Sequence, residues 1–435
     1  MLTRTLFASG YGGQIYSLSF DPSASPPSLS ISSQVSSAGS APTFLTQHPT
    51  LPVLYTGDEF SSADGVLTAF EISQGGGNSS SLVEIGSQGK SKQGPVHFVL
   101  NPQGNQLYSA CYSAGALSTS NLKEDGKFDE EKKGQNFVYG GKGQNPERQE
   151  GPHAHGVAID PSGQFLWCTD LGTDQLHAYQ ISDDRIDFSA SVSTTRGSGP
   201  RHLIFSKTSS PDRSLLYLVS ELANTVSIYE VLSPSAAAAP PVELPPATTD
   251  DSEMPPATED VKPDTKPIPM APVPGPPVIP KPTVNPLQLD VSILPPNATG
   301  EWTAAELAIS EDKKFLYVSN RAPTEPELPK TDYLTILALD EEGKVVEGEE
   351  AKTFKELGGV GPRHFELSSA SSQKEEGIVK MEDGETTKGE GEKTYMAVAF
   401  QRTNEVVIYQ VEGKEIEEVT RIGGIEGATC VIWKQ

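Results

Sequence analysis

Arginine and histidine residues recur at the starts of short repeated stretches of this 435-residue chain. Gly199-Pro-Arg-His202 and Gly361-Pro-Arg-His364 share one motif, and Gly94-Pro-Val-His97 is a variant of it. A guanidinium group offers forked donors that suit a carboxylate, a phosphate or a developing oxyanion. An imidazole can move a proton near neutral pH. If the fold brings these stretches close together, the motif indicates proton transfer on a small anionic molecule.

A further stretch, Pro152-His-Ala-His-Gly156, follows a turn of the same kind. Five of the seven histidines in the chain lie beside these turns: His97, His153, His155, His202 and His364. His153 and His155 have the spacing of a metal-ligand pair, but no carboxylate cluster with ligand spacing accompanies them. We therefore expect neither a metal nor an organic cofactor. For His97, His202 and His364 a structural role, locking the turn by hydrogen bonds, is the alternative to substrate contact.

The elements that must position these residues are short strands. Residues 151–181 contain three apolar runs separated by Pro and Gly turns, which predicts an antiparallel meander. The pattern restarts seven times, at Pro42, Pro95, Pro152, Pro200, Thr303, Pro362 and Ala428. The first four starts are 53, 57 and 48 residues apart, close to the period of a four-stranded propeller blade.

The last repeat has one strand, at 427–433, and the strands that it lacks lie at the N-terminus, in residues 6–10, 14–20 and 29–32. Closing the ring with strands from both termini would leave no blade with an exposed sheet edge. The sequence thus predicts an all-β fold, a single domain over residues 1–435 that forms a seven-bladed β-propeller.

Two intervals between repeats are too long for a blade. Residues 234–286 are rich in Pro, Ala and acidic residues, and residues 368–393 are rich in Lys, Glu and Gly. Neither composition can bury enough apolar area to order itself, so both are predicted to be disordered insertions. Lengthening a loop costs little entropy, which favours a tolerated solvated insertion. Recognition of a partner through PxxP sequences in 234–286 is the alternative.

The repetition places equivalent residues around one axis, because the innermost strand of each blade faces the central channel. Glu221 and Arg321 end the second runs of their repeats, and strand direction alternates, so we expect them at the same mouth as the turns. The candidate catalytic residues are His155, Glu221, Arg201 and Arg321. The candidate substrate-binding residues are His153, His97, His202, Glu306, Arg363 and His364.

The composition of the chain disfavours some classes of binding partner. The net charge is −25, which disfavours nucleic acids and anionic membranes because both require a basic surface. The chain has no run of 18 apolar residues, and its first residues have too short an apolar stretch for a secretory signal. Three cysteines far apart favour reduced thiols. We expect a cytoplasmic protein that is a monomer, and a dimer is the alternative.

At these residues the chain resembles the lactonase family of seven-bladed propellers. That family includes bacterial-type 6-phosphogluconolactonase and the fungal-type 3-carboxy-cis,cis-muconate lactonising enzyme. The motifs that carry the resemblance are Pro152-His-Ala-His-Gly156, Gly199-Pro-Arg-His202, Ser220-Glu-Leu-Ala-Asn224, Trp302-Thr-Ala-Ala-Glu306 and Ser319-Asn-Arg321. The resemblance spans the repeats, and it departs at both insertions and at the fifth repeat, which lacks the Gly-Pro turn. It implies that the family's catalytic histidine, two arginines and glutamate fall on His155, Arg201, Arg321 and Glu221.

Three functions follow as expectations. The first is hydrolysis of a sugar lactone with an anionic group, such as 6-phosphoglucono-δ-lactone, in which the arginines hold the anion and His155 activates water. In that scheme Glu221 either carries a second proton or orients an arginine. The second is 3-carboxy-cis,cis-muconate cyclase activity, a cycloisomerisation at the same anion site. The third is a non-catalytic propeller that serves as a binding scaffold.

Overall fold

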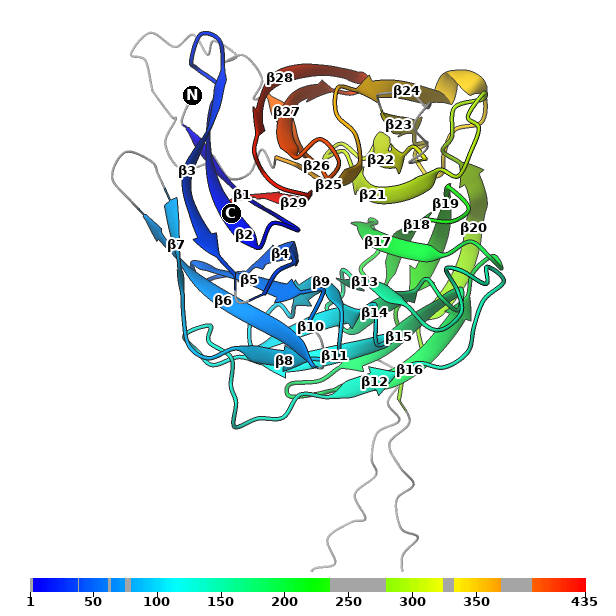
Figure 1. The fold of residues 1–435 in the computed structure, drawn as a ribbon. Helices are drawn as coiled ribbons and strands as arrows, with labels where there is room; N and C mark the ends of the chain where they lie inside the picture. Colours follow the sequence, from blue (N-terminus) through cyan, green and yellow to red (C-terminus); the bar gives the residue numbers. More distant parts are fainter. Residues whose placement is uncertain are drawn as a thin grey trace, which may run out of the picture.

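Antiparallel strands build almost the whole of the computed structural model, which describes residues 3–37, 39–61, 64–74, 80–234, 279–323, 332–368 and 393–435. The strands form seven sheets of four strands each, and one sheet carries a fifth short strand. Each sheet is one blade of a ring around a central axis (Figure 1). The all-β seven-bladed propeller predicted from the repeats is confirmed.

The strands occupy four positions from the axis outward. The innermost strands are β29 (Ala428–Trp433), β4 (Pro42–Gln47), β9 (Pro95–Leu100), β13 (Ala154–Ile159), β17 (Pro200–Lys207), β21 (Thr303–Ile309) and β25 (Pro362–Leu367). The second strands are β1 (Arg4–Gly10), β5 (Val53–Asp58), β10 (Gln106–Cys111), β14 (Phe165–Asp170), β18 (Arg213–Ser220), β22 (Phe315–Arg321) and β26 (Thr394–Phe400). All seven predicted repeat starts therefore lie at or just before innermost strands.

The two outer positions complete the blades. The third strands are β2 (Gln14–Asp21), β6 (Gly65–Gln74), β11 (Ala116–Asn121), β15 (Gln175–Ile181), β19 (Thr225–Leu232), β23 (Asp332–Ala338) and β27 (Glu405–Glu412). The outermost strands are β3 (Ser28–Ser36), β7 (Ser80–Glu84), β12 (Asn136–Val138), β16 (Ile186–Ser193), β20 (Thr283–Ser292), β24 (Lys352–Leu357) and β28 (Glu415–Gly423). A short strand β8 (Gly89–Ser91) pairs with β6, and a 3₁₀ turn, η2 (Glu349–Ala351), precedes β24.

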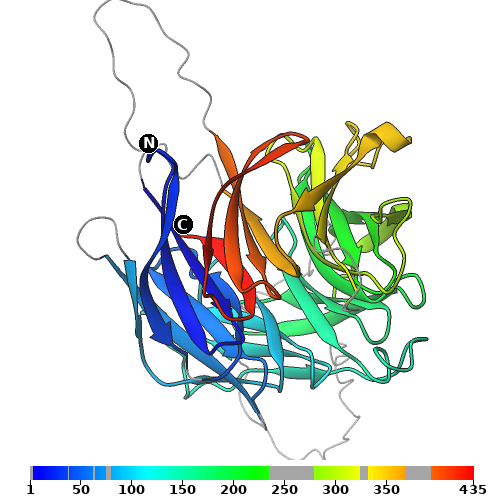
Figure 2. The ribbon, with the colours of Figure 1, turned by 45° about the horizontal axis from the view of Figure 1, so that its top comes forward.

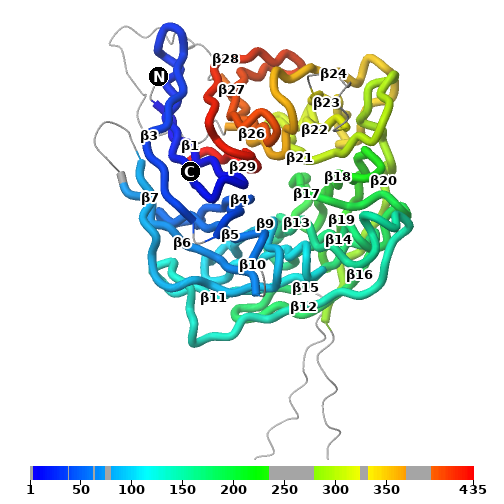
Figure 3. The backbone as a smooth tube through the Cα atoms, viewed as in Figure 1, coloured from blue at the N-terminus to red at the C-terminus, as the bar shows by residue number. Residues whose placement is uncertain are grey.

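The ring closes through strands from both termini, as predicted. The C-terminal strand β29 pairs with the N-terminal strand β1, with Ala8 opposite Val431 and Leu6 opposite Trp433. Each innermost strand also contacts the innermost strands of both neighbouring blades, β29 included. Figure 2 shows the C-terminal strand beside the N-terminal strands, and Figure 3 shows both chain ends on the same side of the ring.

Apolar side chains fill the spaces between blades. The core divides into seven clusters, and the one at the closure joins Phe20 of β2, Tyr395 of β26 and Trp433 of β29. The Phe20 and Tyr395 rings meet edge to face, with centroids 5.0 Å apart. Because every blade shares its apolar faces with two neighbours, no blade can bury its core alone.

The Gly-Pro turns have a conformational reason. Gly94, Gly199 and Gly361 have φ angles of +76°, +64° and +78°, in the left-handed region that favours glycine. A proline then begins each following innermost strand, where its missing N–H is tolerated. The turn thus fixes where each innermost strand enters the channel.

The predicted C-terminal boundary of the first insertion, residues 234–286, is wrong, because the insertion as predicted includes the start of a strand. Residues 279–286 are described, and β20 begins at Thr283 as the outermost strand beside β19. The stretch Thr283-Val-Asn-Pro-Leu-Gln-Leu289 alternates in polarity, and Pro286 is tolerated because β20 is an edge strand. The remaining parts of both predicted insertions, residues 235–278 and 369–392, lie outside the described residues.

Candidate active site

A cavity of about 390 Å³ opens at one end of the channel. Its walls come mainly from the first residues of innermost strands and from residues at or just after the ends of second strands. The charged lining consists of Arg148, Arg201, Arg321, Arg363, Arg402, Glu59, Glu221 and Glu301. Five arginines against three glutamates leave this cavity positive, in a chain with a net charge of −25. A small anion is therefore favoured there over the rest of the surface.

β-Bulges set the direction of the side chains at the channel mouth of each innermost strand. All seven innermost strands shift register against their second strands near the channel mouth, for example between Pro200 and His202. A bulge lets two successive residues face the same way. Arg201 consequently lines the cavity while His202, the next residue, contacts Glu306 of another blade.

Glu221 is the centre of the charged network. Its Oε1 accepts a hydrogen bond from Arg148 Nη2 at 2.7 Å. Its Oε2 accepts one from Arg201 Nε at 2.9 Å and lies 3.2 Å from Arg321 Nη2. Burial alone would raise the pKa of Glu221, but the three arginines outweigh it and lower the pKa to about 2. Glu221 is therefore a carboxylate at neutral pH, with its oxygens already bonded to guanidinium groups.

Arg201 is the most enclosed of the arginines, with 2% of its surface exposed. Its Nη1 donates to the carbonyl oxygen of Ala305 at 2.6 Å. Burial, together with the nearby Arg321 charge, lowers the pKa of Arg201 to about 10. The guanidinium thus stays charged at neutral pH, and its Nε and Nη1 are held by protein acceptors.

A second arginine group comes from the blade of β25–β28, next to the blade that carries Arg321. Arg363 Nη1 donates to the Tyr11 hydroxyl at 2.8 Å, and Arg363 Nη2 lies 3.5 Å from Glu59 Oε2. Arg402 Nη1 donates to the carbonyl oxygen of Ala322 at 2.8 Å. The Glu59 and Tyr11 partners outweigh burial and raise the pKa of Arg363. Arg363 pairs with one carboxylate, that of Glu59, and is not bonded to Glu221.

His155 is buried in the wall between these groups. Its ring lies 5.6 Å from the Tyr112 ring and 5.1 Å from the His202 ring. Burial and the charge of Arg201 hold the pKa of His155 well below its ordinary value, so the imidazole is neutral at pH 7. Among the described residues, no hydrogen-bond partner reaches His155 Nδ1. His155 thus offers a neutral ring nitrogen that protein groups do not use.

Gly156 explains the Pro152-His-Ala-His-Gly156 motif. A Cβ added there would lie 2.5 Å from the carbonyl oxygen of Arg201, so only glycine lets β13 approach β17 this closely. Thr169 Oγ1 bridges the two strands: it accepts from Gly156 N at 2.7 Å and donates to Arg201 O at 2.6 Å. The close approach sets His155 beside Arg201.

A layer of ionisable side chains lies one residue deeper along the innermost strands. His202 Nδ1 lies 2.9 Å from Glu306 Oε2, and His364 Nε2 lies 3.7 Å from the same oxygen. The His97 ring is 4.5 Å from the His202 ring. Burial lowers the pKa of all three histidines, so they are neutral at pH 7. The layer supports the cavity floor, since Arg201 Nη1 lies 3.3 Å from His202 Nδ1.

The structure brings some of the predicted residues together and separates others. All four candidate catalytic residues line the cavity, as does Arg363, one of the candidate substrate-binding residues. His97, His202, Glu306 and His364 lie beneath the lining rather than in it, because the bulges turn the preceding residue toward the cavity. His153 also lies outside the lining: its ring stacks on Tyr112 with centroids 4.3 Å apart, and its Nε2 faces Glu150.

Several lining residues were missed from the sequence. Glu59 and Tyr112 follow directly after second strands, the position of Glu221, so the rule that found Glu221 would have found them in their own repeats. Arg402 follows β26 by two residues. Arg148 carries no such signal, because it lies in the long connection between β12 and β13.

No three His, Cys, Asp or Glu side chains in the described part of the chain converge as metal ligands. No helix among the described residues is long and apolar enough to cross a membrane.

Relatives were found by sequence and by structure. The 6-phosphogluconolactonase of Bacillus subtilis is 29% identical over 210 residues, 48% of this chain and 57% of that protein. The 6-phosphogluconolactonase of an Enterobacter species is 31% identical over 144 residues, 32% of this chain and 38% of that protein. The chain spans about half the length, or less, of these curated relatives. A periplasmic gluconolactonase from Pseudomonas aeruginosa shares the fold, with a TM-score of 0.69, 20% identity and 99% of each chain covered.

Residues 3–249 and 284–373 match the family described as Lactonase, 7-bladed beta-propeller. The match covers well over half of the chain and includes every candidate catalytic residue. The seven blades of the structure agree with that description. The chain belongs to the seven-bladed β-propeller lactonase family.

Proposed function

We propose that this protein hydrolyses a lactone that carries an anionic group, of the 6-phosphogluconolactone class. The observation that carries the proposal is a pair of buried polar atoms without partners among the described residues, His155 Nδ1 and Arg321 Nε. Both belong to side chains that line the positive cavity. Unpartnered buried polar groups are costly, so a site that keeps them is suited to a ligand that satisfies them.

The chemistry uses neutral His155 as the base. Its free ring nitrogen takes a proton from water, the water oxygen attacks the lactone carbonyl, and charge develops on the carbonyl oxygen. The guanidinium groups of the cavity stabilise that oxyanion. When the ring C–O bond breaks, the imidazolium returns its proton to the leaving oxygen. One water is consumed and one hydroxy acid is formed.

Glu221 has a positioning role in this scheme rather than a proton-transfer role. Its pKa of about 2 keeps it ionised at neutral pH, so it has no proton to give. Its two oxygens fix the orientation of three arginines from three different parts of the chain. This favours the second of the two roles that the sequence left open for Glu221.

Arg363 and Arg402 are the proposed holders of the anionic group. They come from the blade of β25–β28, next to the blade that carries Arg321, and Arg402 Nη1 is bonded only to a backbone carbonyl among the described residues. A phosphate or carboxylate there would gain charge-assisted hydrogen bonds. The lactone ring would then extend toward His155.

The test compares a phosphorylated with an unphosphorylated lactone. Initial rates of ring opening of 6-phosphogluconolactone and glucono-δ-lactone are measured above the spontaneous background for the parent, His155→Ala and Arg363→Ala. We expect His155→Ala to lose about 10²- to 10⁴-fold in kcat on both substrates. Arg363→Ala should lose roughly ten- to a hundredfold in kcat/KM on the phosphorylated substrate and much less on the other.

Two controls match these variants. His48→Ala removes a buried histidine outside the cavity, and Arg185→Ala removes an exposed arginine paired with Asp187. Both should keep the parent rate per folded molecule. If the parent rates equal the background on both lactones, the proposed hydrolase activity is refuted. The next substrate to test is then 3-carboxy-cis,cis-muconate. Turnover of none of the three would favour a binding scaffold.

A further inference from the structure

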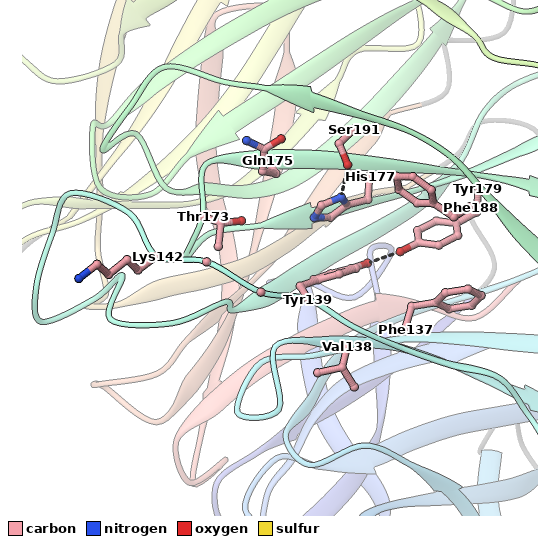
Figure 4. A pocket seen from close by; sticks show the side chains of 12 residues that line it. Phe137, Val138, Tyr139, Lys142, Thr173, Gln175, His177, Tyr179, Phe188 and Ser191 are labelled. Atoms are coloured by element: carbon pink, nitrogen blue, oxygen red, sulfur yellow. Dashed lines mark hydrogen bonds between the residues drawn. The ribbon is translucent and has the colours of Figure 1, made fainter.

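A second cleft lies on the outer side of the ring, between the blade of β9–β12 and the blade of β13–β16. Its volume is about 590 Å³, and it shares no lining residue with the arginine cavity. Figure 4 shows its walls: Phe137 and Tyr139 come from β12 and the residue after it, and His177, Tyr179 and Phe188 come from β15 and β16. We call these five residues the aromatic cleft.

The aromatic rings contact one another in a continuous series. Tyr139 stacks on His177 with centroids 4.1 Å apart, and the Tyr179 hydroxyl donates to the Tyr139 hydroxyl at 3.0 Å. Tyr179 also packs against Phe137 at 4.7 Å and Phe188 at 5.7 Å. These contacts make the walls rigid, so the cleft needs no rearrangement before it binds.

Part of this aromatic surface is exposed. Phe188 is 49% exposed, and Val138, which also lines the cleft, is 65% exposed. Neighbouring exposed apolar side chains around a preformed cleft are typical of an interaction site.

One polar atom of the cleft has no partner. His177 Nε2 is buried and lacks a hydrogen bond among the described residues, and its closest acid, Asp170 Oδ2, is 3.9 Å away. His177 Nδ1 lies 2.7 Å from Ser191 Oγ. When the Ser191 hydroxyl donates to Nδ1, Nε2 carries the ring hydrogen and can donate to a carbonyl oxygen of an occupant.

The chain itself passes beside β16, a strand that contributes Phe188 and Ser191 to the cleft. The carbonyl oxygen of Pro280 accepts a hydrogen bond of 2.7 Å from Ser189 Oγ, and Ser189 is the residue next to Phe188 on β16. One residue, Ile279, separates Pro280 from the stretch Pro267-Ile-Pro-Met-Ala-Pro-Val-Pro-Gly-Pro-Pro-Val278. Seven of these twelve residues are proline or glycine, and the stretch lies outside the described residues.

Proline-rich segments bind aromatic-lined grooves, since the polyproline II backbone is extended in advance and its carbonyls point outward. At about 3.1 Å per residue, three or four residues before Pro280 span the roughly 10 Å thickness of a sheet. The edge strand β16 is therefore no barrier between Pro280 and the cleft. The occupant is tethered within reach, which gives it a high effective concentration.

We propose that residues 267–278 of this same chain bind in the aromatic cleft, with proline rings against Tyr139 and Phe188 and a backbone carbonyl on His177 Nε2. The proposal does not rest on the lactonase activity. It assigns the proline-rich sequence, which connects β19 to β20, a contact with the neighbouring blade of β13–β16.

The test removes the segment and returns it as a peptide. Leu232 of β19 pairs with Thr283 of β20, so a short Gly-Ser linker can replace residues 235–278 without separating these strands. A fluorescein-labelled peptide of residues 263–281 is titrated into this deletion variant and into the full chain, and fluorescence anisotropy is measured. We expect saturable binding to the deletion variant and at least tenfold weaker binding to the full chain, whose own segment competes.

Two variants locate the binding surface. In the deletion background, Phe188→Ala should weaken peptide binding roughly tenfold or more, because a half-exposed ring is lost from the contact. Phe60→Ala, which removes another exposed phenylalanine at 62% exposure, should leave binding unchanged. A peptide with its prolines replaced by alanine should bind at least tenfold less well than the parent peptide.

Four outcomes would overturn the proposal. They are no binding to the deletion variant, equal binding to the full chain, binding insensitive to Phe188→Ala, and a concentration-dependent dimer of the full chain that the deletion abolishes. The last would show that the segment binds a second copy instead of its own chain. Thermal unfolding of the variants confirms that each is folded.

Discussion

Replacing Glu221 with glutamine should destabilise the propeller as well as impair the site. The carboxylate is 4% exposed and accepts from, or contacts, the guanidinium groups of Arg148, Arg201 and Arg321. Glutamine keeps the shape but removes the charge and turns an amide N–H₂ toward an arginine. Removing one partner of a buried ion pair costs about 3–5 kcal/mol, since the remaining charge is left uncompensated.

The pKa of Glu221 gives an independent figure. The folded pKa is about 2 and the ordinary value is 4.5, a difference of about 2.5 pKa units. At 1.36 kcal/mol per unit, ionised Glu221 contributes about 3 kcal/mol to the free energy of unfolding at pH 7. Because the folded pKa is depressed, this contribution is present above pH 4.5 and falls away as the pH approaches 2. By pH 3.5 about 1 kcal/mol of it should be gone.

The assay is urea unfolding followed by tryptophan fluorescence, at pH 7 and at pH 3.5, for the parent and Glu221→Gln. We expect a difference in unfolding free energy of about 3–5 kcal/mol at pH 7, smaller by about 1 kcal/mol at pH 3.5. Glu230→Gln is the control: its partner Arg213 is 33% exposed, so the loss should stay below about 1 kcal/mol. A Glu221→Gln loss no larger than the control, or one that is equal at both pH values, would refute the reasoning.

Burial and the charge of Arg201 hold the pKa of His155 well below its ordinary value, so kcat/KM for lactone hydrolysis should not fall as the pH is lowered from 8 through 6.5; a fall centred near pH 6.5 in a pH–rate profile would contradict this. Gly199→Ala should lower the thermal midpoint clearly, because its φ is +64° and the new Cβ would meet Leu222 Cγ at 2.6 Å. Gly163→Ala, with φ +72° but space for a Cβ, should cost only about 1–2 kcal/mol, and equal losses would contradict the steric argument. The three cysteines are buried and burial raises the pKa of their thiols, so the folded protein should not react with a thiol reagent at pH 8 until urea unfolds it; stoichiometric labelling of the folded state would contradict this.

The repeat pattern predicted the fold because apolar runs recur at blade spacing along the chain. At three innermost strands, β9, β17 and β25, a glycine with positive φ followed by a proline also marks the start. Even the shared blade was predictable, since the last repeat lacks strands that residues 4–36 supply. The fourth strand β20 was missed because Pro286 and its proline-rich surroundings conceal the alternation of an edge strand.

The site was predictable in part. Equivalence between repeats identified Arg201, Arg363, Glu221 and Arg321 as residues of one mouth, and the structure brings all four to one cavity. The bulges, which separate Arg201 from His202 in depth, are a property of strand pairing and leave no mark in the residue types. Arg148 was missed because the repeats do not constrain the connection between β12 and β13.

The closure between β1 and β29 has a consequence for synthesis on the ribosome. Gly10 and Ala428 pair in the folded protein, yet 418 residues separate them along the chain. At about 5–20 residues per second, β1 waits roughly 20–80 s for its partner strand to be translated. During that interval the N-terminal hairpin presents an open strand edge, so nascent chains of this protein are more exposed to misassociation than finished ones.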